Sequence, residues 1–156
     1  MKCTADISWS KEAKEVFVDG KYSRVHQWLF DGGMQFSASS SPAIVPLPMS
    51  DASLVDPEEA FLASISSCHM LFFLSFCAKQ KYTVTRYDDH AEGILGEGED
   101  DKKQMLLVTL HPIAVFEGDQ LPSADAIHHM HELAHENCFI ANSVKTKIVI
   151  NLSHKN

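Results

Sequence analysis

Residues 56–79, DPEEAFLASISSCHMLFFLSFCAK, form the most strongly determined stretch of this 156-residue chain. Asp56 can cap a helix, Pro57 suits the first helical position because the N–H it lacks has no partner there, and Glu59 completes a capping box. Apolar side chains then fall on every face from residue 60 to residue 78, which predicts a helix buried on all sides. The rest of the fold must surround this helix.

A membrane span is the main competing interpretation of this stretch, because about 20 apolar residues can cross a bilayer. Five polar side chains interrupt the run, and no other strongly apolar segment flanks it: Ser64, Ser66, Ser67, His69 and Ser75. We therefore expect a soluble protein with no membrane partner. The N-terminus, MKCTADISW, lacks the apolar core of a signal peptide and no targeting motif closes the chain, so we expect a cytoplasmic location.

Length, charge and cysteine spacing limit the function classes. A chain of 156 residues is expected to form one domain, residues 1–156. Its 21 acidic against 13 basic side chains give a net charge of -8, which argues against a nucleic-acid partner. Cysteines at positions 3, 68, 77 and 138 show no C-x-x-C pairing, so neither a disulfide framework nor a four-cysteine zinc site is indicated.

The remaining patterns predict an α+β fold around the central helix. Alternation, turn residues and helical spacing predict the following elements in chain order: strands at 3–9, 15–18, 21–30 and 34–37, a long loop over 37–55, two β-like runs at 82–95 and 105–116 joined as a hairpin with an acidic tip, a helix from a Ser123 cap to about Cys138, and a strand at 144–152. His111-Pro112 should interrupt the hairpin ladder, because proline has no N–H to donate.

Cys68 lies in the middle of the central helix, where its neighbours one turn away supply no charge. An apolar setting raises a thiol pKa above its free value of about 8.5, so a reactive Cys68 needs a cation from elsewhere in the fold. His69 cannot supply it, because adjacent helical side chains point about 100° apart. The residues alone leave two alternatives open: an inert core cysteine, or a reactive one with a distant cation.

Arg24 is a candidate for that cation. Strand alternation places it on one face with aromatic residues and a histidine: Tyr22, His26, Trp28 and Phe30. Its stem can simply rest on a ring at the surface, or its guanidinium can be held over a site. The chain contains only two arginines, Arg24 and Arg86, and this scarcity favours the second interpretation.

The segment DPEEAFLASISSCHM, followed about seventy residues later by LAHENC, resembles the osmotically inducible protein C and organic hydroperoxide resistance (OsmC/Ohr) family. Members have a proline-glutamate helix start ten residues before a first cysteine, and a second cysteine late in a following helix. The resemblance covers nearly the whole chain. It implies an intertwined homodimer in which antiparallel sheets pack around two long helices, with active sites near the subunit interface.

The resemblance also implies roles for four residues. Cys68 corresponds to the peroxidatic thiol, Cys138 to the resolving thiol, Glu58 to the carboxylate of the proline-glutamate motif, and Arg24 to the activating arginine. Ten helical residues rise about 15 Å, so in a straight helix Glu58 cannot touch Cys68 of its own chain. We therefore expect Glu58 to act by holding Arg24, with the subunit origin of each residue left open.

The resemblance implies that the protein reduces organic hydroperoxides as part of an antioxidant stress response. Hydrogen peroxide is a second candidate substrate. Cys68 would become a sulfenic acid, Cys138 would resolve it as a disulfide, and an external dithiol, often of lipoyl type, would restore both thiols. No cofactor and no metal are expected. Two positions depart from many relatives: Phe139 rather than proline follows Cys138, and His69 follows Cys68. These departures are typical of a divergent subgroup.

Two alternatives remain open. His128, His131, His135 and Cys138 share one face of the second helix at a spacing that zinc accepts, although an open site needs a fourth ligand. These histidines can equally be ordinary polar residues. A non-catalytic binding protein of the same fold is the other alternative, and in it Cys68 would be buried and unreactive.

Overall fold

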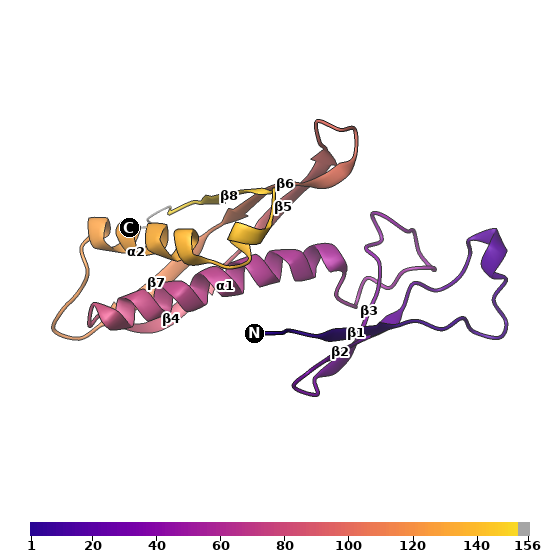
Figure 1. Cartoon of the computed structure of the whole chain (residues 1–156), viewed down its shortest axis with the longest axis horizontal. Helices are drawn as coiled ribbons and strands as arrows, with labels where there is room; N and C mark the ends of the chain where they lie inside the picture. Colours follow the sequence, from indigo (N-terminus) through magenta and orange to yellow (C-terminus); the bar gives the residue numbers. More distant parts are fainter. Residues whose placement is uncertain (153–156) are drawn as a thin grey trace. The chain divides into compact units, whose positions relative to one another are not determined.

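The structure is a computed structural model that describes residues 1–152. The chain forms two compact units, residues 1–61 and residues 62–156. The elements, in order, are β1 (Ala5–Ser8), a 3₁₀ helix (Phe17–Asp19), β2 (His26–Phe30), β3 (Gln35–Ala38), α1 (Pro57–Lys79), β4 (Thr83–Asp89), β5 (Glu92–Glu97), β6 (Lys103–Leu110), β7 (Pro112–Glu117), α2 (Ala124–Asn137), a second 3₁₀ helix (Ala141–Ser143) and β8 (Lys147–Ile150) (Figure 1).

The first unit is built on the antiparallel sheet β1-β2-β3. Trp28 lies opposite Ile7 on one side and Phe36 on the other, so apolar side chains meet across the three strands. The strand predicted at 15–18 is wrong, because a 3₁₀ helix occupies residues 17–19. Gly20 ends that helix at a φ of 75° and donates its N–H to the Phe17 carbonyl.

The predicted loop between β3 and α1 is confirmed, and backbone hydrogen bonds fix its two ends. The Ser39 N–H donates to the Val55 carbonyl at 3.0 Å. At the start of α1, the Asp56 carboxylate accepts from the Glu59 N–H at 2.8 Å, and the Glu59 carboxylate accepts from the Asp56 N–H at 3.1 Å. The expected capping box is therefore present, and it sets where α1 begins.

Only one stripe of α1 is buried: Ile65, His69, Phe73 and Cys77, four residues apart. The prediction of burial on all sides is wrong for this chain, since Leu71 is 63% exposed. The reason is that the second unit's other elements cover a single face of the helix. By length and composition α1 passes as a membrane span, but its buried stripe is typical of the core helix of a soluble fold.

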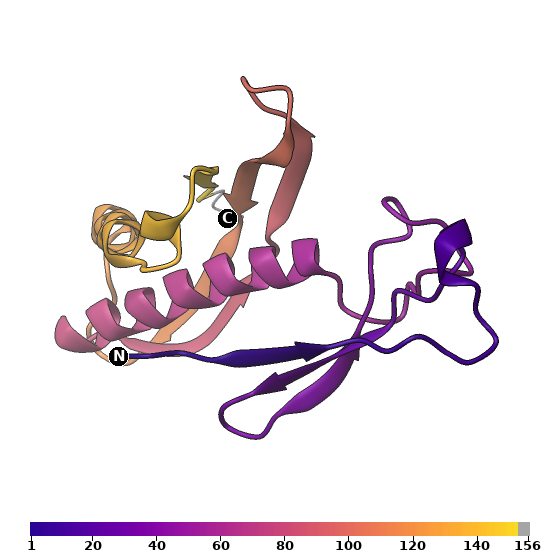
Figure 2. The ribbon, with the colours of Figure 1, turned by 45° about the vertical axis from the view of Figure 1, so that its right-hand side comes forward.

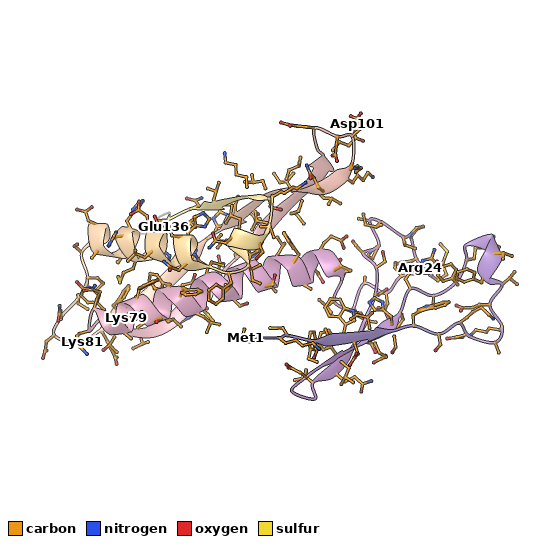
Figure 3. The ribbon with its side chains drawn as sticks, viewed as in Figure 1. Met1, Arg24, Lys79, Lys81, Asp101 and Glu136 are labelled. Atoms are coloured by element: carbon orange, nitrogen blue, oxygen red, sulfur yellow. The ribbon has the colours of Figure 1, made fainter. Side chains whose placement is uncertain are left out.

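Two sheets make up the strands of the second unit. The predicted hairpin divides at residues 90–91 and at His111, so that β4 pairs with β7 while β5 pairs with β6. The interruption expected at His111-Pro112 is confirmed. β8 joins β6 in parallel, whereas antiparallel sheets were expected, because the crossover through α2 returns the chain in the same direction. Asp101 lies in the turn between β5 and β6 (Figure 3).

α2 packs beside α1 within the second unit (Figures 1 and 2). Ser123 caps α2 as predicted, since its hydroxyl oxygen accepts from the Ala126 N–H at 3.2 Å. The buried cluster between the helices consists of Phe73, Cys77, Met130 and Ala134. The second unit thus has a core that fixes the two helices against each other.

Phe73 is the largest fully buried side chain of this core. We expect Phe73→Ala to lower the free energy of unfolding by about 3–5 kcal/mol, because the lost apolar burial leaves a cavity. Leu121→Ala is the control, since Leu121 is 63% exposed in the loop between β7 and α2, and it should cost less than about 1 kcal/mol. Denaturant unfolding of both variants checks this, and similar losses in the two would contradict the assigned core.

Candidate active site

The structure brings Cys68 and Cys138 together. Cys68 is half-buried on α1, whereas Cys138 is 1% exposed at the residue that ends α2. The two side chains lie close enough for the Cys68 thiol to raise the pKa of Cys138, and both thiols are free. These two neighbouring thiols, one from α1 and one from the end of α2, form a distinctive chemical group of the second unit.

Local structure holds Cys138 on both sides. Its backbone N–H donates to the His135 carbonyl at 3.3 Å, and its carbonyl accepts from the Asn142 N–H at 3.0 Å. The Ala141 N–H also points at the Cys138 Sγ, 3.3 Å away. The chain therefore turns tightly around this sulfur, and the thiol is fixed in its direction.

Burial controls the acidity of the second thiol. Desolvation and, to a smaller extent, the neighbouring Cys68 thiol raise the pKa of Cys138 to about 11, against the lowering effect of the Ala141 N–H. Desolvation also raises the pKa of Cys77 to about 11, and Cys77 lies in the core cluster away from the pair. Cys138 is thus protonated at neutral pH, and Cys77 has the character of an inert structural thiol.

A cavity of about 520 Å³ opens onto Cys68. Its lining is apolar and hydroxylic: Ser64, Ser67, Leu71, Phe72, Ser75, Phe139 and Ile140. Among the described residues, no charged side chain lines this cavity. The cavity suits the apolar body of an organic molecule, and it supplies no cation to Cys68.

Arg24 and Glu58 line a second cavity, of about 540 Å³, within the first unit. The Arg24 guanidinium carbon lies 3.6 Å from the centre of the Tyr22 ring, and the group donates to the carbonyls of Gly20, at 3.1 Å, and of Tyr22 (Figure 3). Within residues 1–152 the structure shows no ion pair between Arg24 and Glu58. Arg24 therefore both rests on a ring and faces a cavity.

The four site residues predicted from the sequence thus lie as two pairs in the structure. Cys68 meets Cys138 in the second unit, and Arg24 shares a cavity with Glu58 in the first. Trp9, Phe17 and Tyr22 form an aromatic wall of the Arg24 cavity that the sequence prediction did not assign. The signal for part of this wall was present, since Trp9 ends the predicted first strand.

Sequence reasoning also missed a buried pair of histidines. His69 Nε2 lies 2.9 Å from His131 Nδ1, and the two side chains are 1% and 2% exposed. Desolvation lowers the pKa of His69 to about 4 and that of His131 to about 3. The detectable signal was periodicity: His69 occupies the four-residue apolar spacing of α1, and His131 lies seven residues before Cys138 on α2.

The zinc alternative is not supported by this arrangement. Residues 1–152 contain no group of three or more His, Cys, Asp or Glu side chains placed to hold a metal ion. His128 instead approaches the Glu132 carboxylate at 3.3 Å on the surface, while His131 turns inward to His69. The shared helix face therefore separates into surface and core positions.

Comparison with solved structures shows the same fold. An OsmC-like protein of unknown function from Vibrio cholerae is 50% identical, with a TM-score of 0.95 over 97% of this chain and 98% of that one. An organic hydroperoxide resistance protein from Elizabethkingia anophelis is 16% identical, with a TM-score of 0.69 over 96% and 92%. OhrB of Bacillus subtilis is 15% identical, with a TM-score of 0.62 over 97% and 98%.

The architecture and the thiol pair define an α+β protein in which a cysteine in the middle of α1 lies beside a cysteine at the end of α2. The family model described as OsmC-like protein matches residues 50–153. The chain therefore belongs to the OsmC-like protein family, which confirms the resemblance seen in the sequence. A comparison with curated proteins found no match.

The buried histidines make stability depend on pH. In the unfolded chain a histidine binds a proton below about pH 6.5. In the folded protein His69 binds its proton only near pH 4, and His131 only near pH 3. The free energy of unfolding should therefore be highest above pH 6.5 and should fall on acidification, by up to about 1.4 kcal/mol per pH unit for each ring.

Denaturant unfolding at pH 7 and pH 5 checks this prediction. His131→Asn removes one titrating ring and should weaken the dependence, whereas His128→Gln, at the surface, should leave it unchanged. An equal dependence in all three proteins would show that other groups control it.

Proposed function

We propose that this protein is a thiol-dependent peroxidase that reduces organic hydroperoxides, with Cys68 as the peroxidatic and Cys138 as the resolving cysteine. The observation that carries the proposal is that Cys68 lines an apolar cavity with the Cys138 thiol beside it. Organic hydroperoxide resistance proteins share the fold, which supports the same class of reaction. Hydrogen peroxide would be a poorer substrate, because it cannot use the apolar walls.

The reaction has three steps. The Cys68 thiolate attacks the terminal peroxide oxygen, the O–O bond breaks, and the leaving alkoxide takes up a proton to become the alcohol. The Cys138 sulfur then attacks the Cys68 sulfenic acid, forming the S–S bond, and the hydroxyl leaves with the Cys138 proton as water. An external dithiol supplies two electrons and two protons, is oxidised to its own disulfide, and restores both cysteines.

Arg24 and Glu58 are proposed as the charged groups that activate Cys68. Within residues 1–152 no charged side chain lines the thiol cavity, so a thiolate at Cys68 would need a cation from elsewhere. The other arginine, Arg86, is engaged with Asp88 at 2.6 Å on β4. Arg24, in contrast, faces a cavity together with Glu58, which supports its assignment. Either the same chain or a partner copy would supply the two residues.

The remaining proposals concern assembly and electron supply. The half-buried Cys68 at an open cavity leaves a disulfide accessible to an external dithiol, for which a lipoyl group is our candidate. A homodimer is proposed because Leu71 and Phe139 are exposed apolar side chains beside the thiols. We further propose one OsmC-like domain and a cytoplasmic location, where reducing conditions would keep the pair as thiols.

Mass spectrometry of the reduced protein after one equivalent of an organic hydroperoxide tests the two-cysteine reaction. We expect the loss of two hydrogens, and peptide mapping should place a bridge between Cys68 and Cys138. Cys138→Ser should instead accumulate a sulfenic acid on Cys68 that a dimedone probe traps, because no resolving thiol is present.

Cys77→Ser is the matched control, since it removes a buried thiol outside the pair, and it should react like the unaltered protein. If Cys68 stays reduced under conditions in which a control peroxidase is oxidised, the enzyme proposal fails. The non-catalytic binding protein would then be the better explanation.

Arg24→Gln tests the activating cation. Without that charge the Cys68 thiolate loses its stabilisation, so alkylation of Cys68 by iodoacetamide at pH 7 should slow by about tenfold or more. Peptide mapping of the alkylated protein assigns the rate to Cys68. Arg86→Gln is the control, because it removes the other arginine, and it should leave the rate unchanged. An unchanged rate in Arg24→Gln would exclude Arg24 from activation without affecting the assignment of the two cysteines.

A further inference from the structure

We propose that the buried His69–His131 pair positions the resolving cysteine, holding Cys138 at the end of α2 in the direction of Cys68 on α1. The inference rests on the proposed function, because it assigns a role in the second step of that reaction. These are positioning residues: neither ring is required to touch the hydroperoxide or the reacting oxygen.

The two histidines belong to the same two helices that present the two cysteines. His69 directly follows Cys68 on α1, and His131 precedes Cys138 by seven residues, which is two helical turns and returns to the same face of α2. Each histidine is therefore joined to one cysteine through a rigid segment of helix. A bond between the rings fixes the spacing of the same two helices that present the sulfurs.

The geometry of the bond is favourable. The ring planes lie within 2° of parallel and the centroids are 5.2 Å apart, while the bonded nitrogens are 2.9 Å apart. These values place the bond nearly in the plane of both rings, where an N–H points directly at a lone pair. The Phe73 ring stacks on His131 at 4.0 Å and 18°, which prevents the imidazole from turning away.

The second nitrogen of His69 identifies the donor. His69 Nδ1 is buried and has no hydrogen-bond partner in the part of the chain that the structure describes. A buried N–H without a partner is rarer than an unpaired acceptor, so we assign the proton to Nε2. His69 Nε2–H thus donates to His131 Nδ1. An interface that was needed only for packing would be filled at lower cost by two apolar residues, since it would leave no polar atom unpaired.

The chemistry of disulfide closure explains why such a bond would be useful. An S–S bond forms only within a narrow range of cysteine separations and directions, and a misplacement of about 1 Å can slow a positioned reaction about a hundredfold. Cys138 is also held in a dry, protonated state, so its attack depends on placement rather than on a high thiolate fraction. The first step, in which Cys68 attacks the hydroperoxide, does not depend on the position of α2.

Matched amide substitutions separate the hydrogen bond from packing. A glutamine at 69 places an N–H near the original Nε2, and an asparagine at 131 places an oxygen near the original Nδ1, so His69→Gln and His131→Asn should retain the bond. His69→Asn and His131→Gln carry the same amide groups at a different distance from the backbone, so they should lose the hydrogen bond. His69→Leu and His131→Leu remove the polar atoms altogether.

The readout is the split between the two chemical steps. In rapid-quench mass spectrometry with an organic hydroperoxide, His69→Asn and His131→Gln should form the Cys68 sulfenic acid within about twofold of the normal rate but close the disulfide about ten- to a hundredfold more slowly. His69→Gln and His131→Asn should close within about threefold of normal, a rescue that a purely structural role does not predict. Equal closure rates in the retaining and losing variants would overturn the proposal.

A second measurement keeps this inference separate from the peroxidase proposal. Equilibration with mixtures of reduced and oxidised glutathione measures how readily Cys68 and Cys138 form a disulfide, without any hydroperoxide. The losing variants should need an oxidised-to-reduced ratio about tenfold or more higher to form the same fraction of bridge. If the sulfenic acid never forms but this shift appears, the peroxidase fails and the positioning role stands. If the leucine variants do not fold, the amide variants decide the result.

Discussion

The contact between α1 and α2 is the interaction on which the second unit depends. Phe73 is the central residue of this contact, because its ring lies against His131 and also near the Tyr87 and Phe116 rings of β4 and β7. The same face of α1 that buries Phe73 carries His69 one turn earlier and Cys77 one turn later. Apolar burial supplies the stability of this contact, whereas the His69–His131 hydrogen bond within it supplies the register.

A physical conflict follows from placing thiols beside such a contact. Burial presents Cys138 in a fixed direction, but it also raises the pKa of the thiol and so lowers the fraction that is present as the nucleophilic thiolate at neutral pH. The proposed mechanism resolves the conflict by dividing the tasks. The half-buried Cys68 meets solvent and substrate at an open cavity, and the buried Cys138 contributes placement. Reaction with the substrate is thereby assigned to the Cys68 sulfur, and precise placement to the Cys138 sulfur.

Local signals in the sequence predicted much of this arrangement. The Asp56 and Ser123 caps, the interruption at His111-Pro112 and the proximity of Cys68 to Cys138 all follow from short motifs or from the family resemblance. The division of the long hairpin and the parallel pairing of β8 depend on contacts between distant segments, which no local pattern encodes. The partial exposure of α1 was missed for a similar reason: composition shows that a face is apolar, but not what covers it.

The histidines show why a one-helix analysis of chemistry is incomplete. Seen on α2 alone, His131 belongs to a face with metal-ligand spacing, and seen on α1 alone, His69 points away from Cys68. Only the packing of the two helices reveals that these rings face each other in a dry interface, where both have a lowered pKa and remain neutral. A neutral pair can bond without a counter-charge, so it adds polar specificity to the contact without placing an unpaired ion in the core. A histidine pair is therefore better suited than a salt bridge to hold the buried faces of two helices together beside a reactive thiol, because an ion pair would also change the charge environment of the sulfur.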